Sequence, residues 1–272
     1  MSIFYFKLKF FDLIWYNRNM KDLKVKRNIK IEFSYNGQEY YGLQKQKDKI
    51  TVQGEIEKAL KTLFGQDISI NLAGRTDRGV SAQNMVANFF ISFDIPVDKI
   101  SFALNPLLPG NIRILKSCEV EKNFHARFSA KQKTYCYSLY SSQFELPLFP
   151  FETWVKFDLD FCKMKKAIKY LKGKQDFSSF VTNSKQYESL VRTIKKVKIE
   201  KKEIAGFNHY YFYFTGDGFM YNQVRNMVGT IVSVGLHKIK PIDMKKIILS
   251  KNRCNAGSCF PAKGLTLLSV EY

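Results

Sequence analysis

Residues 68–93 read ISINLAGRTDRGVSAQNMVANFFISF, and this stretch decides the fold. Apolar side chains recur at every second position over residues 68–72 and again over residues 87–93. That period is typical of half-buried β-strands, in which successive side chains point to opposite faces of the sheet. Between the two runs, Gly74 and Gly79 bracket a short polar segment and let the backbone turn tightly. The stretch therefore predicts two strands of one sheet that are interrupted by a polar loop.

Outward from this stretch, strand and helix patterns mix along the rest of the chain. Further strands are predicted over residues 29–35, 112–120, 135–139, 191–199, 210–214 and 265–270. Helices are predicted over residues 51–64, 97–104, 159–171 and 220–231, and after Pro241. The mixture predicts an α+β fold with two halves. Because no long linker separates the halves, we expect their sheets to join edge to edge, with the active site in the cleft between them.

The same patterns suggest where each half begins and ends. Residues 28–121 are expected to form an N-terminal α+β half that carries the polar loop, and residues 122–272 a C-terminal α+β half. Residues 1–27 are interpreted as an N-terminal extension, because residues 1–19 show no alternation that leads into the core pattern. Translation is expected to start at Met20, which opens a basic leader. The alternative is that residues 1–19 form an amphipathic arm that packs on the body.

A large excess of positive charge points to a polyanionic partner. The 272 residues include 44 Lys and Arg against 24 Asp and Glu, which gives a formal net charge of +20. This exceeds what solubility needs, and nucleic acid is the favoured partner. Lysine enrichment through AT-rich coding is the alternative, so the charge alone decides little.

The cysteines and the apolar runs indicate a soluble, cytoplasmic protein. Five cysteines without a CxxC pair predict neither a disulfide framework nor a zinc ribbon. Cys254 and Cys259 could be proposed as metal ligands, but no His or second Cys pair lies near them, and we expect no metal or cofactor. The run from Ile3 to Tyr16 is too short for a membrane span and is broken by charged residues.

The polar loop combines one carboxylate with two guanidinium groups. Arg75, Thr76, Asp77 and Arg78 are consecutive at a predicted strand end. Adjacent positive charge keeps a carboxylate ionised and also attracts a phosphate backbone, so a nucleophile and substrate-docking groups would lie together. The alternative for this peptide alone is an ordinary surface turn with an Arg–Asp pair.

The run Gly74–Ala82 closely resembles the signature of the TruA family of tRNA pseudouridine synthases, in which an aspartate attacks the target uridine. Further stretches resemble the family in the same order: Tyr40–Gln44, Thr51–Glu55, Leu104–Asn105 with Leu108–Pro109, His125–Ala130, Lys133–Tyr137, Asp176–Phe180, Val191–Ile194, Gly216–Tyr221, Val224–Gly229 and Pro261–Leu265. The resemblance extends from about Asn28 to Tyr272. Many short motifs in a shared order are far harder to obtain by chance than any single one.

The resemblance implies a role for each matching residue. Asp77 would be the nucleophile, Arg225 would pair with it, and Tyr135 would stack on the uracil. Arg75 would help to hold the target nucleotide flipped out of its helix. The remaining residues expected to bind substrate are Thr76, Arg78, Arg127 and Asn222. If the family resemblance is set aside, Tyr135 is better interpreted as an ordinary core residue and Arg225 as a solvent-exposed helix residue.

The family also implies a fold and a reaction. Two ferredoxin-like, or RRM-like, halves would be joined through a largely antiparallel sheet, and two subunits would form a basic groove for one RNA. Uridine would be isomerised in the anticodon stem-loop of tRNA, at the family positions 38, 39 and 40, without a cofactor. Whether Asp77 attacks the sugar, attacks the base or instead removes a sugar proton is left open.

Two departures from the family pattern leave the RNA target open. The family usually has His at the position of Ser81 and often has His at that of Asn222. A divergent paralogue that modifies another RNA, such as ribosomal RNA, is therefore an alternative. A non-catalytic RNA-binding protein is a second one, although Asp77 and Arg225 are both present. An unrelated hydrolase is disfavoured, because the chain has only three histidines and no nucleophile-elbow serine.

Overall fold

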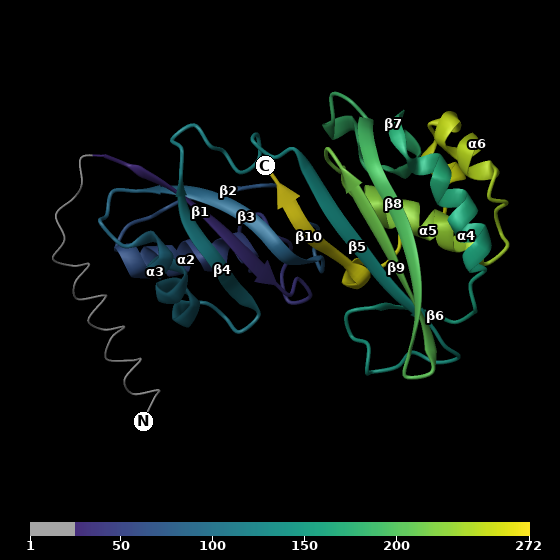
Figure 1. Ribbon diagram of the computed structural model, residues 1–272, viewed down its shortest axis with the longest axis horizontal. Helices are drawn as coiled ribbons and strands as arrows, with labels where there is room; N and C mark the ends of the chain where they lie inside the picture. Colours follow the sequence, from purple (N-terminus) through teal and green to yellow (C-terminus); the bar gives the residue numbers. More distant parts are fainter. Residues whose placement is uncertain (1–24) are drawn as a thin grey trace. The chain divides into compact units, whose positions relative to one another are not determined.

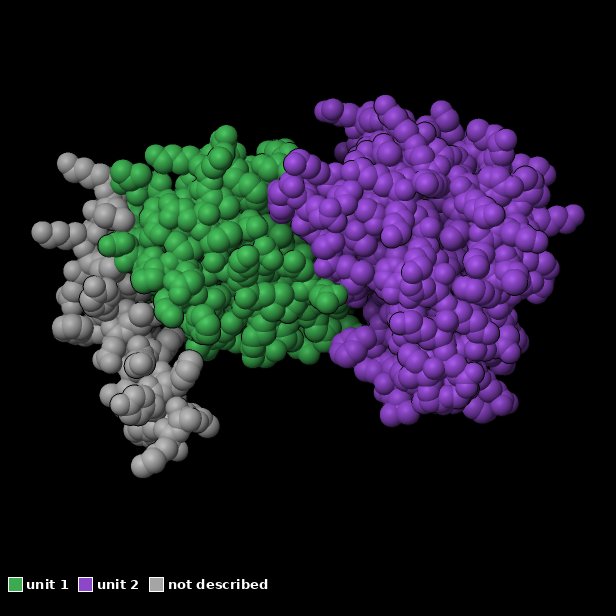
Figure 2. Space-filling model, in the orientation of Figure 1, with its two compact units in different colours: residues 1–130 green, residues 131–272 purple. Residues whose placement is uncertain are grey.

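A computed structural model describes residues 25–272 of the chain (Figure 1). The predictions for residues 1–19 and for a start at Met20 lie outside the described residues. The chain divides after Ala130 into two compact units, which Figure 2 distinguishes by colour. Within residues 25–272, no helix combines the length and the apolar character needed to cross a bilayer.

Within residues 25–130, unit 1 is a four-stranded antiparallel sheet with two α-helices. Its elements are β1 (Arg27–Tyr35), α2 (Val52–Phe64), β2 (Asn71–Leu72), β3 (Ser81–Ile91), α3 (Val97–Leu104), the short η1 (Asn105–Leu107) and β4 (Ile112–Val120). The strands lie in the order β4-β1-β3-β2, and each neighbouring pair is antiparallel. This is the βαββαβ arrangement of ferredoxin-like folds.

Local sequence signals explain where the unit 1 elements begin and end. Side chains of β1 are buried at alternating positions from Ile29 onward, as the apolar period requires. Helix α2 begins after Thr51, whose side chain accepts a hydrogen bond from the Gly54 N–H, and ends at Gly65, which is left-handed with φ 72°. Six apolar residues of α2 form its buried stripe.

Unit 2 repeats this arrangement with additional elements. Its elements are β5 (Gln132–Ser141), β6 (Thr153–Val155), α4 (Phe161–Ile168), η2 (Lys169–Leu171), β7 (Gly173–Asp176), η3 (Ser178–Phe180), η4 (Ser184–Gln186), β8 (Val191–Ile204), β9 (Phe207–Gly216), α5 (Gln223–Gly235), α6 (Asp243–Ser250), η5 (Arg253–Asn255), η6 (Ala262–Gly264) and β10 (Leu265–Glu271). The strands follow the order β10-β5-β9-β8-β7, with β6 beside β5. Only the β5–β6 pair is parallel among those described in this unit.

The two units therefore share one topology. If the strands of each ferredoxin-like motif are numbered one to four along the chain, both sheets have the order four-one-three-two. In unit 2 the four strands are β5, β8, β9 and β10, with α4 and α5 in the two crossover connections (Figure 1). The predicted α+β fold with two ferredoxin-like halves and largely antiparallel pairing is confirmed.

Several bounds shift between the predicted and the observed elements, and three differences are the most informative. The strand expected over residues 68–72 pairs only at Asn71 and Leu72. Met220, expected in the apolar stripe of a helix, precedes α5, which begins at Gln223. The short strands β6 and β7 were not predicted, because three and four residues are too few for a recognisable period.

Candidate active site

The loop between β2 and β3 is a tight turn that buries Ala73, Thr76 and Val80 and leaves Asp77 and the two arginines accessible. The Val80 N–H donates to the Asp77 carbonyl over 3.1 Å, and Gly79 takes a left-handed φ of 81°. Thr76 is buried, and its hydroxyl lies 2.7 Å from that of Tyr35 in β1. Asp77 is partly exposed. Anchoring Thr76 on β1 thus sets the position from which the next residue, Asp77, projects.

A second segment, residues 37–43, packs directly against this loop. The Leu43 N–H donates to the Thr76 carbonyl over 3.3 Å. Gly42 has φ 105°, and a Cβ there would lie 3.1 Å from the Thr76 oxygen. At Gly37 a Cβ would lie only 1.9 Å from the Val80 oxygen, so this position admits no larger residue without movement of the chain. Backbone packing alone therefore holds the loop closely on one side.

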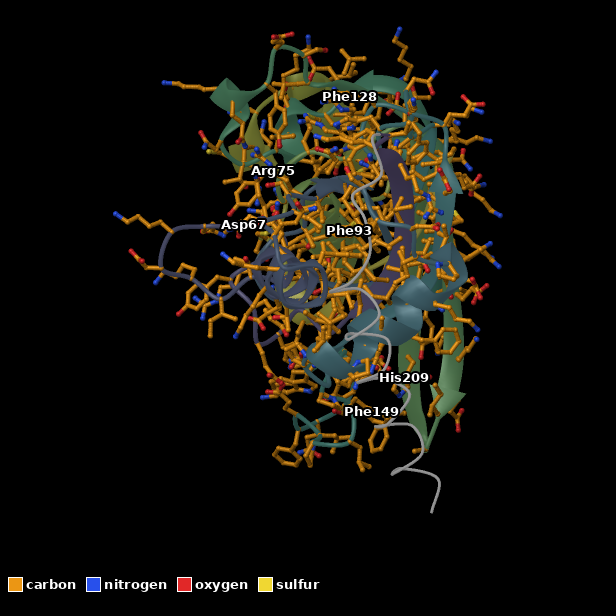
Figure 3. All side chains as sticks on the ribbon, turned by 90° about the vertical axis from the view of Figure 1, so that its left-hand side faces the viewer. Asp67, Arg75, Phe93, Phe128, Phe149 and His209 are labelled. Carbon is orange, nitrogen blue, oxygen red and sulfur yellow. The ribbon has the colours of Figure 1, made fainter. Side chains whose placement is uncertain are left out.

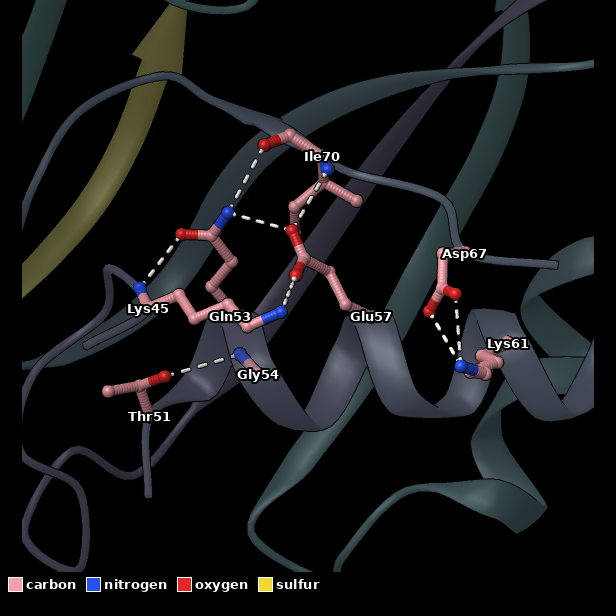
Figure 4. A network of polar contacts seen from close by, with 8 residues as sticks. All are labelled: Lys45, Thr51, Gln53, Gly54, Glu57, Lys61, Asp67 and Ile70. Carbon is pink, nitrogen blue, oxygen red and sulfur yellow. Dashed lines mark hydrogen bonds and ion pairs between the residues drawn. The ribbon is translucent and has the colours of Figure 1, made fainter. Parts of the chain in front are cut away.

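A polar network on α2 fixes the segment that enters the loop (Figure 4). The Glu57 carboxylate accepts from the Ile70 N–H over 3.2 Å and from the Gln53 side-chain amide over 2.8 Å. The same carboxylate forms an ion pair with Lys45 over 3.0 Å. Gln53 in turn accepts from the Lys45 N–H. Glu57 thus ties together α2, the segment before β2 and the segment after residue 43.

Arginines precede and follow Asp77 in the loop, and an aromatic ring lies against one of them. Arg75 and Arg78 are both exposed, and Figure 3 labels Arg75 at the surface. The Arg78 guanidinium carbon lies 4.4 Å from the centre of the Tyr41 ring. Arg75, Thr76, Asp77 and Arg78 lie together because they are consecutive, and the structure adds Tyr41, which the sequence had not singled out. Its only signal was membership of the Tyr40–Gln44 motif.

Arg225 is held in a defined orientation within unit 2. It lies in the first turn of α5 and is partly buried. Its Nε donates to the Phe260 carbonyl over 2.7 Å, and its Nη1 donates to the Asn222 side-chain oxygen over 2.7 Å. The alternative of a solvated helix position is therefore wrong. Sequence reasoning missed Phe260, because a backbone carbonyl leaves no signature in residue identity.

Tyr135 lies in β5 near the same region of unit 2. Its side chain is 8 % exposed, and its ring meets Phe219 edge to face at 5.3 Å. Tyr137 lies on the same face of β5, two residues along, and its ring centre is 6.1 Å from that of Phe260. Because Phe260 also anchors Arg225, Tyr135 and Arg225 both belong to the region where β5 meets the start of α5.

Burial and charge act in opposite directions on Tyr137. Burial raises the pKa of the Tyr137 hydroxyl well above its usual value, against the lowering effects of the Thr153 hydrogen bond and of the Arg225 charge. The hydroxyl donates to the Pro261 carbonyl over 2.7 Å. Tyr137 is thus a neutral structural group that supports the chain segment holding Arg225.

The remaining predicted residues have distinct surroundings. Asn222 is left-handed with φ 60° and contacts Arg225, so it orients that side chain. Arg127 is exposed, and its guanidinium carbon lies 5.6 Å from the ring centre of Phe128, which is labelled in Figure 3. Ser81, where the family usually has His, accepts a hydrogen bond from the Gly37 N–H over 3.1 Å. Both departures therefore have structural roles next to the predicted site.

Comparisons with known proteins define the class to which this fold and these residues belong. A family model described as tRNA pseudouridine synthase matches residues 32–129 and 167–272. The chain belongs to this family. It is 44% identical over 248 residues to tRNA pseudouridine synthase A of Acetivibrio thermocellus, with 90% of this chain and 100% of that protein covered.

Two further relatives give the same result. The chain is 41% identical to tRNA pseudouridine synthase A of Caldicellulosiruptor bescii and 40% identical to that of Clostridium acetobutylicum, each over 249 residues. In both cases 90% of this chain and 100% of the relative are covered. The predicted family is thereby confirmed, and with it the class of enzyme, an isomerase that acts on tRNA.

Proposed function

We propose that this chain converts uridine to pseudouridine in the anticodon stem-loop of tRNA, with Asp77 as the nucleophile. The observation that carries this proposal is the construction of the β2–β3 loop. Thr76 is anchored in the interior of unit 1, while Asp77 projects beside two exposed arginines. In a member of this family, such a fixed carboxylate is suited to attack a nucleotide whose phosphates bind the neighbouring guanidinium groups.

The reaction exchanges a C–N glycosidic bond for a C–C bond and moves one proton. The C1′–N1 bond of the uridine breaks, the uracil rotates while it stays bound, and C5 bonds to C1′. The proton on C5 is then lost, and N1 carries a proton in the product. Asp77 attacks the sugar or the base to start this sequence. No net oxidation or reduction occurs, so the isomerisation requires no redox cofactor.

Groups from unit 2 would complete the site. Arg225 would pair with Asp77 and keep the carboxylate ionised beside an apolar base. Its bonds to Phe260 and Asn222 support this role, because they restrict the guanidinium before substrate binds. Tyr135 would stack on the uracil, a contact worth ~1–3 kcal/mol for a base on an aromatic ring.

The target nucleotide would be extracted from its helix before it reaches Asp77. Arg75 would help to hold it in the flipped position, and Thr76, Arg78, Arg127 and Asn222 would contribute to RNA binding. We place the reaction in the cytoplasm and assign the active form to a homodimer with a basic groove for one RNA. The net charge of +20 supports a polyanionic substrate.

Pseudouridine mapping of total RNA, with and without the gene, tests this function. The proposal predicts that pseudouridines in the anticodon arm of several tRNAs disappear when the gene is deleted and return when it is restored. Loss confined to ribosomal RNA would contradict the proposed target and identify a divergent paralogue. An unchanged map would contradict the enzyme itself and favour a non-catalytic RNA-binding protein.

A further inference from the structure

Two cationic side chains share one tyrosine ring beside the catalytic loop. The Arg78 guanidinium carbon lies 4.4 Å from the centre of the Tyr41 ring, and the Lys49 ammonium nitrogen lies 4.6 Å from it. The two cations are therefore no farther apart than the sum of these distances. Tyr41 is 40% exposed, so the arrangement lies at the surface.

The backbone holds Tyr41 firmly in this position. The Tyr41 N–H donates to the Ile50 carbonyl over 3.0 Å, and the Tyr41 carbonyl accepts from the Gln46 side chain over 2.7 Å. On either side of Tyr41, Tyr40 is buried and Gly42 packs on the Thr76 carbonyl. The backbone of Tyr41 therefore has a fixed position relative to the loop that carries Asp77.

The two cations of this cluster take no part in the salt bridges of the described chain. Within residues 25–272, no ion pair involves Arg78 or Lys49, although Asp77 and Asp48 adjoin them in the chain. By contrast, Lys45 in the same segment pairs with Glu57. An aromatic face attracts cations but carries no net charge, so two positive charges remain available to an anion.

We propose that Arg78, Lys49 and Tyr41 form a phosphate clamp for the RNA backbone next to the nucleotide that reaches Asp77. Arg78 and Lys49 would bind backbone phosphate oxygens, and Tyr41 would act as a positioning residue that presents both cations. Arg78 directly follows Asp77 in the chain, so a bound phosphate would lie close to the reacting nucleotide. The inference rests on the proposed function, because it requires RNA as the substrate.

The salt dependence of tRNA binding tests the two cations. A phosphate contact contributes ~0.7–0.9 to the magnitude of the slope of log affinity against log salt concentration. One such contact therefore makes the affinity fall by an additional factor of about 5 to 8 when the salt concentration rises from 0.1 M to 1 M. We expect Lys49→Gln and Arg78→Gln each to lower the slope by about this amount with an in vitro transcribed tRNA. Lys58→Gln, on the exposed side of α2, is the matched charge control and should leave the slope unchanged.

Substitutions of Tyr41 test the positioning role separately. Tyr41→Phe keeps the aromatic face and should bind tRNA as the natural protein does. Tyr41→Leu keeps both charges but removes that face, so we expect affinity at 0.1 M salt to fall about 2- to 5-fold with little change in slope. If Tyr41 had only a structural role, the Leu variant would unfold at a lower temperature than the Phe variant. We expect the two variants to unfold at the same temperature.

Two results would overturn the clamp. The first concerns the salt slope: Lys49→Gln and Arg78→Gln have the same slope as the natural protein, or Lys58→Gln lowers the slope as much as they do. The other is equal tRNA affinity for Tyr41→Leu and Tyr41→Phe. Failure of the proposed function is distinguishable, since in that case the natural protein would bind tRNA without forming pseudouridine, or would not bind it.

Discussion

The two units share one strand order but differ at the connection between their second and third strands. In unit 2, β8 and β9 have 14 and 10 residues and are joined by a two-residue turn. Both turn residues are left-handed, Ala205 at φ 52° and Gly206 at φ 80°, as short hairpins of this kind require. In unit 1, β2 has only two residues, and the loop to β3 carries Asp77.

The difference shows how one scaffold serves two purposes. Unit 2 extends its hairpin and gains continuous backbone pairing. In unit 1, strand pairing is short at the corresponding connection between β2 and β3, and the unpaired backbone is stabilised by other contacts. These are the Glu57 network, the Thr76–Tyr35 contact and the close packing of Gly37 and Gly42. A reactive loop on rigid supports is a common way to place chemistry on a fold.

The largest expected effect concerns the group that unit 2 would contribute to the unit 1 loop. Arg225→Met keeps bulk but removes charge, and we expect pseudouridine formation to fall ~10²–10³-fold, as for loss of one electrostatic stabiliser. The Asp77 carboxyl would then need a higher pH to ionise, so residual activity should rise with pH. A pH–rate profile under single-turnover conditions measures this. A residual rate that is independent of pH would contradict the pairing.

Close packing of the unit 1 loop gives the second prediction. Gly37→Ala would place a Cβ 1.9 Å from the Val80 oxygen and displace the loop. A shift of about 1 Å can reduce a rate ~100-fold, so kcat should fall by about that factor. Gly110→Ala is the control, because a Cβ there meets nothing within 4 Å. Equal kcat values for the two variants would show that the loop tolerates displacement.

The Glu57 network gives the third prediction. Glu57→Gln replaces one acceptor oxygen with a donor amide, although the carboxylate accepts from Ile70 and Gln53 and pairs with Lys45. We expect a loss of ~1–3 kcal/mol in the free energy of unfolding, typical of a disrupted buried hydrogen bond. Denaturant unfolding measures the loss, and amide exchange at Ile70 should accelerate. Unchanged exchange at Ile70 would contradict the network.

The smallest expected effect lies in the unit 2 hairpin. Gly206→Ala retains the left-handed φ of 80° with nothing within 4 Å of the added Cβ. The strain should reduce the free energy of unfolding by ~1–2 kcal/mol. The rate of pseudouridine formation should stay unchanged, because this turn carries no reacting group. A lowered rate would indicate that the two hairpins are not functionally distinct.

The sequence predicted most of the fold, and its failures have physical causes. Residues 68–70 alternate like a strand, but the Ile70 N–H and carbonyl are bound by side chains of Glu57 and Gln53 rather than by a neighbouring strand. Periodicity records burial and cannot distinguish these two ways of satisfying the backbone. For the same reason, the sequence contained no sign of the Phe260 carbonyl that holds Arg225.

The candidate site was predictable where a motif named the residue. Arg75, Thr76, Asp77 and Arg78 are consecutive, so their proximity follows from the chain itself. The contacts of Arg78 with Tyr41 and of Arg225 with Asn222 are set by packing and by a left-handed backbone. Only the structure reveals contacts of this kind, because no residue spacing implies them.

The most direct test of the central proposal is single-turnover tritium release from tRNA labelled at C5 of uridine, with Asp77→Asn. This change keeps the size of the side chain and removes the nucleophile. We predict that tritium release is abolished while tRNA affinity stays near that of the natural protein, because phosphate contacts supply most of the affinity. Substantial release of tritium by Asp77→Asn would contradict the assignment of Asp77 and the mechanism built on it.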